Sequence, residues 1–422
     1  MEKILIALML ALTLAVGQEL NSAATSSTHH PEWSRNVAIY EVNLRQYSSG
    51  GTFREFEEHL PRLKEMGIGI LWFMPIHPIG KVNRKGTLGS YYSVQDYKAV
   101  NPRYGTLDEF KALVRKIHDM DMYVIIDWVA NHTAWDNKMT EDHPEWFTQN
   151  KDGNFQPPVP DWHDVIDLNY DNRELWQYMA DAMKFWLIEA GIDGFRCDVA
   201  EMVPPKFWEE SIPQLRDVKP IFMLAEGAVP ELHEIGFDMT YNWDLYYLMN
   251  DIAQGRRNAA DLNAFFIKEL SQYKPDDYRM LFTSNHDENS WNGTVFERLG
   301  ESAGTFAVLT MTLPGMPLVY NGQESGMNKR LSFFEKDEIE WQDHPFAEIY
   351  KTLLNLKKEN PALWNGTAGG SFSPIPTTNE KHVFAFYRQK GEAEVVVILN
   401  LSSKEQWISL SDGEVNGEYR NI

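Results

Sequence analysis

The chain has 422 residues, 43% hydrophobic and 24% charged, which is typical of a soluble globular protein with two or three domains, or of one large barrel with attachments. Its formal net charge of −22 argues against nucleic acid as a partner, because a phosphate-binding surface needs clustered Lys and Arg. An uncharged or cationic partner suits this balance better. Because Cys197 is the single cysteine, no internal disulfide and no cysteine-based metal site can form.

The N-terminus has the pattern of an export signal. Lys3 supplies a basic residue, and the apolar stretch 4–16 that follows is too short to span a bilayer. Ala15 and Gly17 are small residues suited to a cleavage site. We therefore predict that residues 1–27 are a signal peptide and a disordered start. The protein is then secreted or periplasmic, with no membrane insertion after cleavage.

After this segment, short β-branched or aromatic runs alternate with amphipathic stretches. Helical periods cover 53–67, 107–120 and 174–191, and strands interleaved with helices indicate a parallel sheet. Eight strand–helix units predict an α/β fold in which residues 28–364 form a closed (β/α)8 TIM barrel. The eight strand candidates are 36–44, 69–75, 122–129, 194–199, 221–226, 238–243, 279–285 and 316–322.

Two intervals break this alternation. Residues 132–170, after the third strand, are polar, aromatic and proline-bearing, and they are too long for an ordinary loop. We expect them to form a small excursion domain that walls the mouth of the barrel. Residues 365–380 have a linker-like composition, and 382–389 and 394–402 then form hairpin-like strands. Residues 365–422 are therefore predicted to be a short C-terminal all-β domain.

Charged residues stand at the carboxyl ends of the predicted strands, where barrel enzymes place their active sites. Asp127, Asp198 and Glu226 each end one strand, and Asp287 follows another. A single acid of this kind is more often a helix cap or a solvated loop residue, but four strand ends with the same feature favour a site. Paired carboxylates are what cleavage of a glycosidic bond requires. Arg196, two residues before Asp198, points to the same face.

Seven motifs then carry a resemblance that covers nearly the whole mature chain. Their order along the chain resembles the α-amylase family of glycoside hydrolases, and seven motifs in register are a highly specific signal. They are GSYYSVQDY (89–97), DWVANH (127–132), VIDLN (165–169), GFRCDVAE (194–201), LAEG (224–227), FTSNHD (282–287) and GMPLVYNGQE (315–324).

This resemblance implies that Asp198 is the nucleophile and Glu226 the general acid and base, with Asp287 stabilising the transition state. It also implies sugar contacts. For the histidines, the ordinary alternative is a hydrogen-bonded core residue. Cys197 is expected to point away from the mouth into the packing layer. The residues implied to bind sugar are Tyr92, which would stack on the ring, together with Asp127, His132, Arg196 and His286.

Three departures from the family pattern matter. Gly89 occupies the position where exo-acting relatives carry an aspartate, which implies an open cleft and internal cleavage of α-1,4-glucans. Asn131 and Asp167 match two ligands of a structural Ca²⁺, but Met202 replaces a histidine, and Asn131 could instead brace its loop through hydrogen bonds. The C-terminal domain is short for the family, so it is either truncated or reduced.

The leading hypothesis is an exported, retaining α-glucan hydrolase with no organic cofactor. A 4-α-glucanotransferase or neopullulanase-like enzyme would use the same site, and a catalytically silent sugar-binding relative is a remote alternative. The retaining mechanism rests on Asp198 and Glu226 ending adjacent strands. Arg196 is expected to hold Asp198 ionised, and that negative charge is expected to raise the pKa of Glu226.

Overall fold

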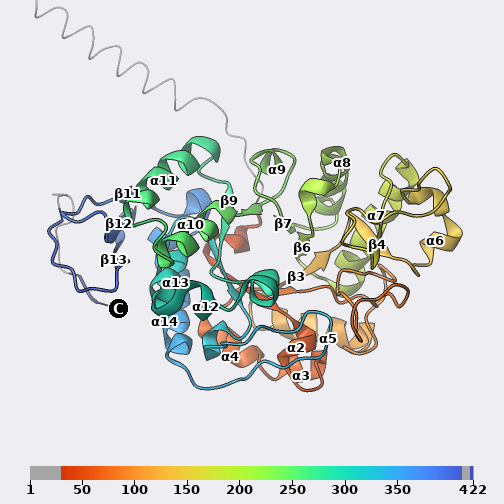
Figure 1. Cartoon of the computed structure of the whole chain (residues 1–422), viewed down its shortest axis with the longest axis horizontal. Helices are drawn as coiled ribbons and strands as arrows, with labels where there is room; N and C mark the ends of the chain where they lie inside the picture. The colour runs from red at the N-terminus through yellow and green to blue at the C-terminus, as the bar shows by residue number, and fades with distance from the viewer. Residues whose placement is uncertain (1–29, 411–418, 422) are drawn as a thin grey trace, which may run out of the picture.

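The computed structural model describes residues 30–410 and 419–421, so the predicted signal segment lies outside the described residues. Eight parallel strands close into a barrel in the order β1-β2-β3-β6-β7-β8-β9-β10, and β10 pairs with β1. The predicted (β/α)8 fold and all eight strand candidates are confirmed (Figure 1). The strands are β1 (Ile39–Val42), β2 (Ile70–Phe73), β3 (Tyr123–Trp128), β6 (Gly194–Cys197), β7 (Phe222–Ala225), β8 (Met239–Tyr241), β9 (Tyr278–Leu281) and β10 (Met316–Tyr320).

Alternating side chains divide the core into two layers. Ile39, Trp72 and Ile125 pack together inside the barrel, whereas Tyr40 and Val124 on the same strands pack outward against the helices. No helix in the described ranges is both long enough and apolar enough to cross a membrane. The barrel helices are α2 (Leu44–Tyr47), α3 (Phe53–Glu57), α4 (Leu60–Met66), α5 (Leu107–His118), α7 (Arg173–Phe185), α8 (Pro205–Arg216), α9 (Glu231–Glu234), α10 (Trp243–Ala253), α11 (Ala260–Gln272), α12 (Val295–Leu299), α13 (Ala303–Thr312) and α14 (Pro345–Glu359).

Local signals set the bounds of these helices. Helix α5 begins after Thr106, which forms a capping box with Glu109. The stretch 53–67, predicted as one helix, forms α3 and α4 instead, and Gly67 ends α4 in the left-handed conformation. The predicted helix 174–191 is α7 followed by a π-helical turn.

The segment predicted as an excursion lies between β3 and β6. It contains β4 (His132–Ala134), α6 (Met139–Asp142) and β5 (Val165–Asp167). Strands β4 and β5 pair antiparallel, with His132 opposite Asp167. Figure 1 shows this segment and the C-terminal strands on opposite sides of the barrel.

The C-terminal part is a three-stranded antiparallel sheet of β11 (Ser371–Pro374), β12 (Val383–Lys390) and β13 (Ala393–Asn400). The interpretation of 365–380 as a linker was wrong for β11. That strand is a half-exposed edge, held by backbone pairing to β12, so it needs few of the apolar residues by which strands are recognised. Residues Phe384 and Phe386 dock the sheet on the barrel through a core shared with Phe266.

Gly194 brings β6 and β7 together at the start of the strand that leads to Asp198. Its φ is +153°, and a Cβ there would lie 1.9 Å from the carbonyl oxygen of Phe222. No side chain fits in this space, so the glycine is required for the close approach of the two backbones.

Replacing Gly194 with Ala is therefore expected to lower the free energy of unfolding by roughly 3 kcal/mol or more, or to prevent folding, because the barrel backbone must shift. Urea denaturation measures the change. Gly304→Ala is the control, because a Cβ there meets nothing nearer than 3.5 Å within α13. The control should gain up to about 1 kcal/mol from helix propensity. Equal stabilities for the two variants would contradict this role of Gly194.

Candidate active site

Side chains from several strand ends surround a cavity of about 620 Å³ at the carboxyl end of the barrel. Five of the predicted site residues line it, while Asp127, Arg196 and His286 are fully buried around it. Cys197 packs in the layer between barrel and helices, as expected. The five predicted residues that line the cavity are Tyr92, His132, Asp198, Glu226 and Asp287.

Arg196 is the centre of the charged network. Its Nη1 donates to Asp198 Oδ1 at 2.9 Å and to Asp127 Oδ1 at 3.0 Å. Its Nη2 forms an ion pair with Glu226 Oε2 at 2.8 Å. Strand register explains the arrangement, because Arg196 lies beside Asp127 on β3 and beside Leu224, two residues before Glu226, on β7. One guanidinium thus holds three carboxyl groups, and it has no exposed surface itself.

Three carboxyl groups around one cation cannot all ionise easily. Burial raises the pKa of Asp198 to about 7 even though Arg196 opposes the shift. Burial also raises the pKa of Glu226 to about 7, with Arg196 lowering it and Asp198 raising it. Arg196 lowers the pKa of Asp198 through its charge and its hydrogen bond, in the expected direction, but burial has the larger effect. Burial therefore favours the protonated form of both carboxyl groups compared with the same groups in water.

The strained backbone at Val199 directs an N–H toward the carboxyl group of Glu226. Its φ and ψ are 37° and 49°, a left-handed conformation that a β-branched residue rarely adopts. In this conformation its N–H donates to Glu226 Oε2 at 2.7 Å. The residue after Asp198 thus orients the carboxyl group of Glu226, at a strain cost of about 1–3 kcal/mol.

The buried His286 links Tyr92 of the cavity wall to Glu41 on β1. Although burial lowers its pKa, the charges of Asp287 and Glu41 raise it to about 9. The protonated ring lies 2.5 Å from Glu41 Oε1 through Nδ1 and 2.6 Å from the Tyr92 hydroxyl through Nε2. That hydroxyl donates to Asp127 Oδ2 at 3.1 Å. The sequence reasoning missed Glu41, although an acid inside the apolar run of β1 gives the same signal as Asp127.

His132 is neutral, because burial lowers its pKa to about 3. Its Nε2 lies 3.9 Å from Asp198 Oδ2, and the ring of Trp162 is 5.3 Å away. The cavity also has aromatic walls that no motif predicted. Their only signal in the sequence was the high aromatic content of 13%, which sequence alone could not assign to a site. These walls are formed by Trp162, Trp291, Phe333 and Phe334.

The two residues predicted to bind Ca²⁺ provide few of the six to eight oxygens that the ion takes. Asp167 Oδ2 accepts from the Thr148 hydroxyl at 2.6 Å, and burial raises the pKa of Asp167. Asn131 Nδ2 lies 3.2 Å from His132 Nδ1, and its main-chain oxygen accepts from Leu168 at 3.1 Å. These contacts resemble a loop brace, so no catalytic step below depends on the ion.

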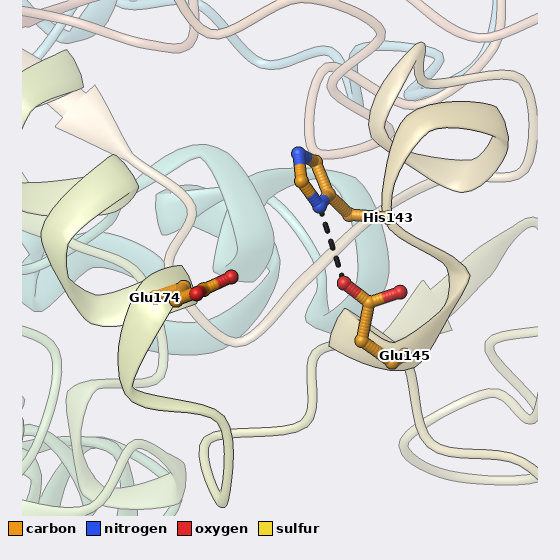
Figure 2. Close-up of side chains that lie close together, drawn as sticks. All are labelled: His143, Glu145 and Glu174. Atoms are coloured by element: carbon orange, nitrogen blue, oxygen red, sulfur yellow. Dashed lines mark hydrogen bonds and ion pairs between the residues drawn. The ribbon is translucent and has the colours of Figure 1, made fainter.

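Another group could hold a metal by distance alone. His143, Glu145 and Glu174 place one ligand atom each within 4.8 Å of the others, the one such group in the described chain (Figure 2). His143 Nδ1 lies 3.1 Å from Glu145 Oε1, and its ring stacks on Trp146 at 3.9 Å. Both glutamates are exposed, and none of the three lines the catalytic cavity, so we assign no ion to them.

If Asn131 and Asp167 bind Ca²⁺ as predicted, EDTA lowers both the melting temperature and the activity, and added Ca²⁺ restores both. The reason is that an ion that binds only the native state stabilises it. Differential scanning fluorimetry and a reducing-sugar assay measure the two effects. Asp167→Asn should remove the response to EDTA. If EDTA changes neither property of the wild type, Asn131 and Asp167 only brace the loop.

A second prediction concerns the burial of Asp198. Because its folded-state pKa of about 7 lies above the unfolded value, this group makes the native state lose stability as the pH rises from about 4 to 7. Asp198→Asn cannot ionise and avoids this loss. We expect the variant to be more stable than the wild type at pH 8, by on the order of 2 kcal/mol, with the difference shrinking toward pH 4.

Urea unfolding at pH 5 and pH 8 measures this difference. Asp152→Asn, at an exposed loop position, is the matched control and should show no such dependence on pH. An Asp198→Asn variant that is less stable than the wild type at pH 8 would show that the ion pair with Arg196 outweighs burial.

Comparisons with known proteins identify the family of the chain. A family model described as the catalytic domain of α-amylase matches residues 43–163 and 146–246. The fold is similar to the crystal structure of a noncanonic maltogenic α-amylase, AmyB, from Thermotoga neapolitana. The two share 33% identity with a TM-score of 0.83, covering 92% of this chain and 90% of that one.

Two curated relatives extend the comparison. Alpha-amylase 3 of Dictyoglomus thermophilum is 28% identical over 463 residues, covering 91% of this chain and 88% of that protein. An α-1,4-glucan:maltose-1-phosphate maltosyltransferase of Picrophilus torridus is 28% identical over 414 residues, and the chain spans 62% of its length. With the barrel, the carboxyl cluster and these similarities together, the chain belongs to the α-amylase family of glycoside hydrolases.

Proposed function

We propose that this enzyme is an exported, retaining hydrolase that cleaves internal α-1,4-glucosidic bonds of starch-like polysaccharides and maltooligosaccharides. The observation that carries the proposal is the contact of Asp198 and Glu226 with one guanidinium at the ends of adjacent strands. This arrangement favours the separation of about 5–5.5 Å that a retaining pair needs over the roughly 6.5–9.5 Å of an inverting pair.

In the proposed reaction, Glu226 is protonated and gives its proton to the glycosidic oxygen as that bond breaks. The Asp198 carboxylate attacks the anomeric carbon and forms a covalent glycosyl ester. Glu226 then takes a proton from water, which displaces Asp198 and leaves the product with the α configuration. Asp287, whose side chain is 34% exposed at the cavity, stabilises the positive charge that develops on the sugar.

The surrounding residues position these groups and the sugar. Tyr92 and His132 line the cavity, and we assign them direct sugar contacts. Three buried residues outside the cavity lining hold the carboxyl groups and the Tyr92 hydroxyl in place. They are Arg196, Asp127 and His286. Gly89 stands where exo-acting relatives carry an aspartate, and this supports internal cleavage.

One observation favours the glycosyl-transfer alternative. Lys85 Nζ pairs with Asp164 Oδ1 at 3.0 Å and donates to the Asp161 carbonyl oxygen at 2.7 Å. All three residues line the cavity, so the loop after β2 and the excursion meet along one wall. A wall formed by this contact would limit the length of glucan that the cavity accepts, which favours the 4-α-glucanotransferase or neopullulanase-like alternative. A silent sugar-binding role is disfavoured, because all three acids are present.

The mechanism predicts that the first product released from a maltooligosaccharide is the α-anomer, because two displacements at one carbon restore its configuration. Proton NMR of fresh product reads the anomer directly. Asp198→Asn should reduce kcat by at least about 10⁴-fold while the circular dichroism spectrum stays that of the wild type. β-product as the first species would overturn the retaining mechanism.

Product assays with the wild-type enzyme distinguish internal hydrolysis from glycosyl transfer. Rapid loss of viscosity of soluble starch supports internal cleavage, whereas slow release of glucose alone rejects it. Maltooligosaccharides longer than maltotriose, formed from maltotriose, identify transfer. Lys151→Ala, an exposed change outside the cavity, serves as the matched control and should behave as the wild type.

A further inference from the structure

A second pocket of about 530 Å³ lies on the other side of the loop that follows β2. It is formed by the turn after α2, the loop after β2, the segment before α5 and Lys336. Its volume is in the range of small-molecule sites. None of its lining residues lines the catalytic cavity, so it is a separate feature of the molecule.

Positive charge distinguishes this pocket. Five cationic side chains line it, and no Asp or Glu does, in a chain with 61 acidic and 39 basic residues. Within residues 30–410 and 419–421, none of the five forms an ion pair with a carboxylate. Such a cluster is not what the average charge of this protein would produce. The five are Arg45, Lys81, Arg84, Arg103 and Lys336.

The innermost cations are held in place without being neutralised. Arg45, only 5% exposed, donates from Nη1 to the carbonyl oxygens of Gly89 at 3.0 Å and Phe333 at 3.1 Å. Its guanidinium lies 3.8 Å over the Tyr91 ring. Arg84 donates to the Gly80 carbonyl oxygen at 2.7 Å. Carbonyl oxygens satisfy these donors and fix the side chains, but they leave the full positive charge in the pocket.

The charges act on one another. Burial lowers the pKa of Arg84, Asp136 opposes this, and the charges of Arg45 and Arg103 lower it further. Two acids border the pocket and hold the backbone of residues that line it. Asp136 accepts from the backbone N–H of Lys81 at 3.0 Å, and Glu55 accepts from the backbone N–H of Gly50 at 2.8 Å. Neither carboxylate is among the lining residues, so the five cationic side chains leave the pocket an excess of positive charge that a bound anion would offset.

We propose that this pocket binds a phosphate group, either as inorganic phosphate or as the phosphate ester of a small sugar. Guanidinium groups match the geometry of phosphate oxygens, and pre-ordered donors lower the entropic cost of binding. Lys81 and Arg103 are exposed, and their charged ends make no hydrogen bond in the described chain, so their donors are free for the ligand.

Phosphate bound in this pocket would also affect the wall of the catalytic cavity. Arg45 holds the carbonyl oxygen of Phe333, whose side chain lines the catalytic cavity. Lys336, three residues along, donates to the carbonyl oxygens of Arg45 and Ser48. A ligand bridging Arg45 and Lys336 would therefore stiffen the cavity wall that carries Phe333. This inference stands independently of the proposed glucan hydrolysis, because it concerns binding in a different pocket.

Thermal unfolding with increasing inorganic phosphate at constant ionic strength tests the proposal. We expect a saturable rise in melting temperature that chloride does not produce, since a ligand specific to the native state stabilises it. Glucose 1-phosphate forms a second arm. A larger rise with glucose 1-phosphate identifies a sugar ester as the ligand, and equal rises identify phosphate alone; either result supports the site.

The Lys81→Ala/Arg103→Ala variant should weaken phosphate binding at least tenfold without changing the melting temperature in its absence. Lys151→Ala/Lys381→Ala removes the same charge at exposed positions outside the pocket and should bind phosphate as the wild type does. Asp198→Asn should also bind normally, which separates the pocket from the catalytic cavity. Phosphate effects equal to those of chloride, or unchanged in the Lys81/Arg103 variant, would overturn the proposal.

Discussion

The contact of one buried guanidinium with three carboxyl groups is the interaction on which the rest of the site depends. Arg196 touches Asp127, Asp198 and Glu226 from within the barrel. Burying the Arg196 cation without these partners would carry a large desolvation free energy, and burying the three charged carboxyl groups without the cation would carry a larger one. The barrel holds both because the strands on either side of Arg196 deliver the acids at hydrogen-bonding distance.

This excess of carboxyl groups over cations is also what gives the site its chemistry. A single matched ion pair would leave both groups fully charged and inert as acids. Here burial raises the pKa of Asp198 and of Glu226 to about 7, which favours their protonated forms near neutral pH. The left-handed backbone at Val199 adds an N–H that orients Glu226. Strain and desolvation are thus concentrated where the reacting groups meet.

In the basic pocket, on the far side of the loop after β2, cations exceed carboxyl groups. There Arg45 and Arg84 are satisfied by carbonyl oxygens, and no carboxylate lines the pocket. The two sites share the chain segment from Phe333 to Lys336, which contributes side chains to the catalytic cavity at one end and to the basic pocket at the other. The same loops therefore separate a cluster rich in acids from one rich in cations.

The eight strands, the barrel and the acids at the strand ends could be predicted from the amino-acid sequence, because the alternation of apolar runs and the position of a charge within a run are local properties. The folded structure was needed to show which acids share Arg196, that Glu41 holds His286, and that β11 pairs as an edge strand. It also decided the direction of the Asp198 pKa shift. Burial and pairing between distant segments set these features, and neither is encoded in the spacing of residues along the chain.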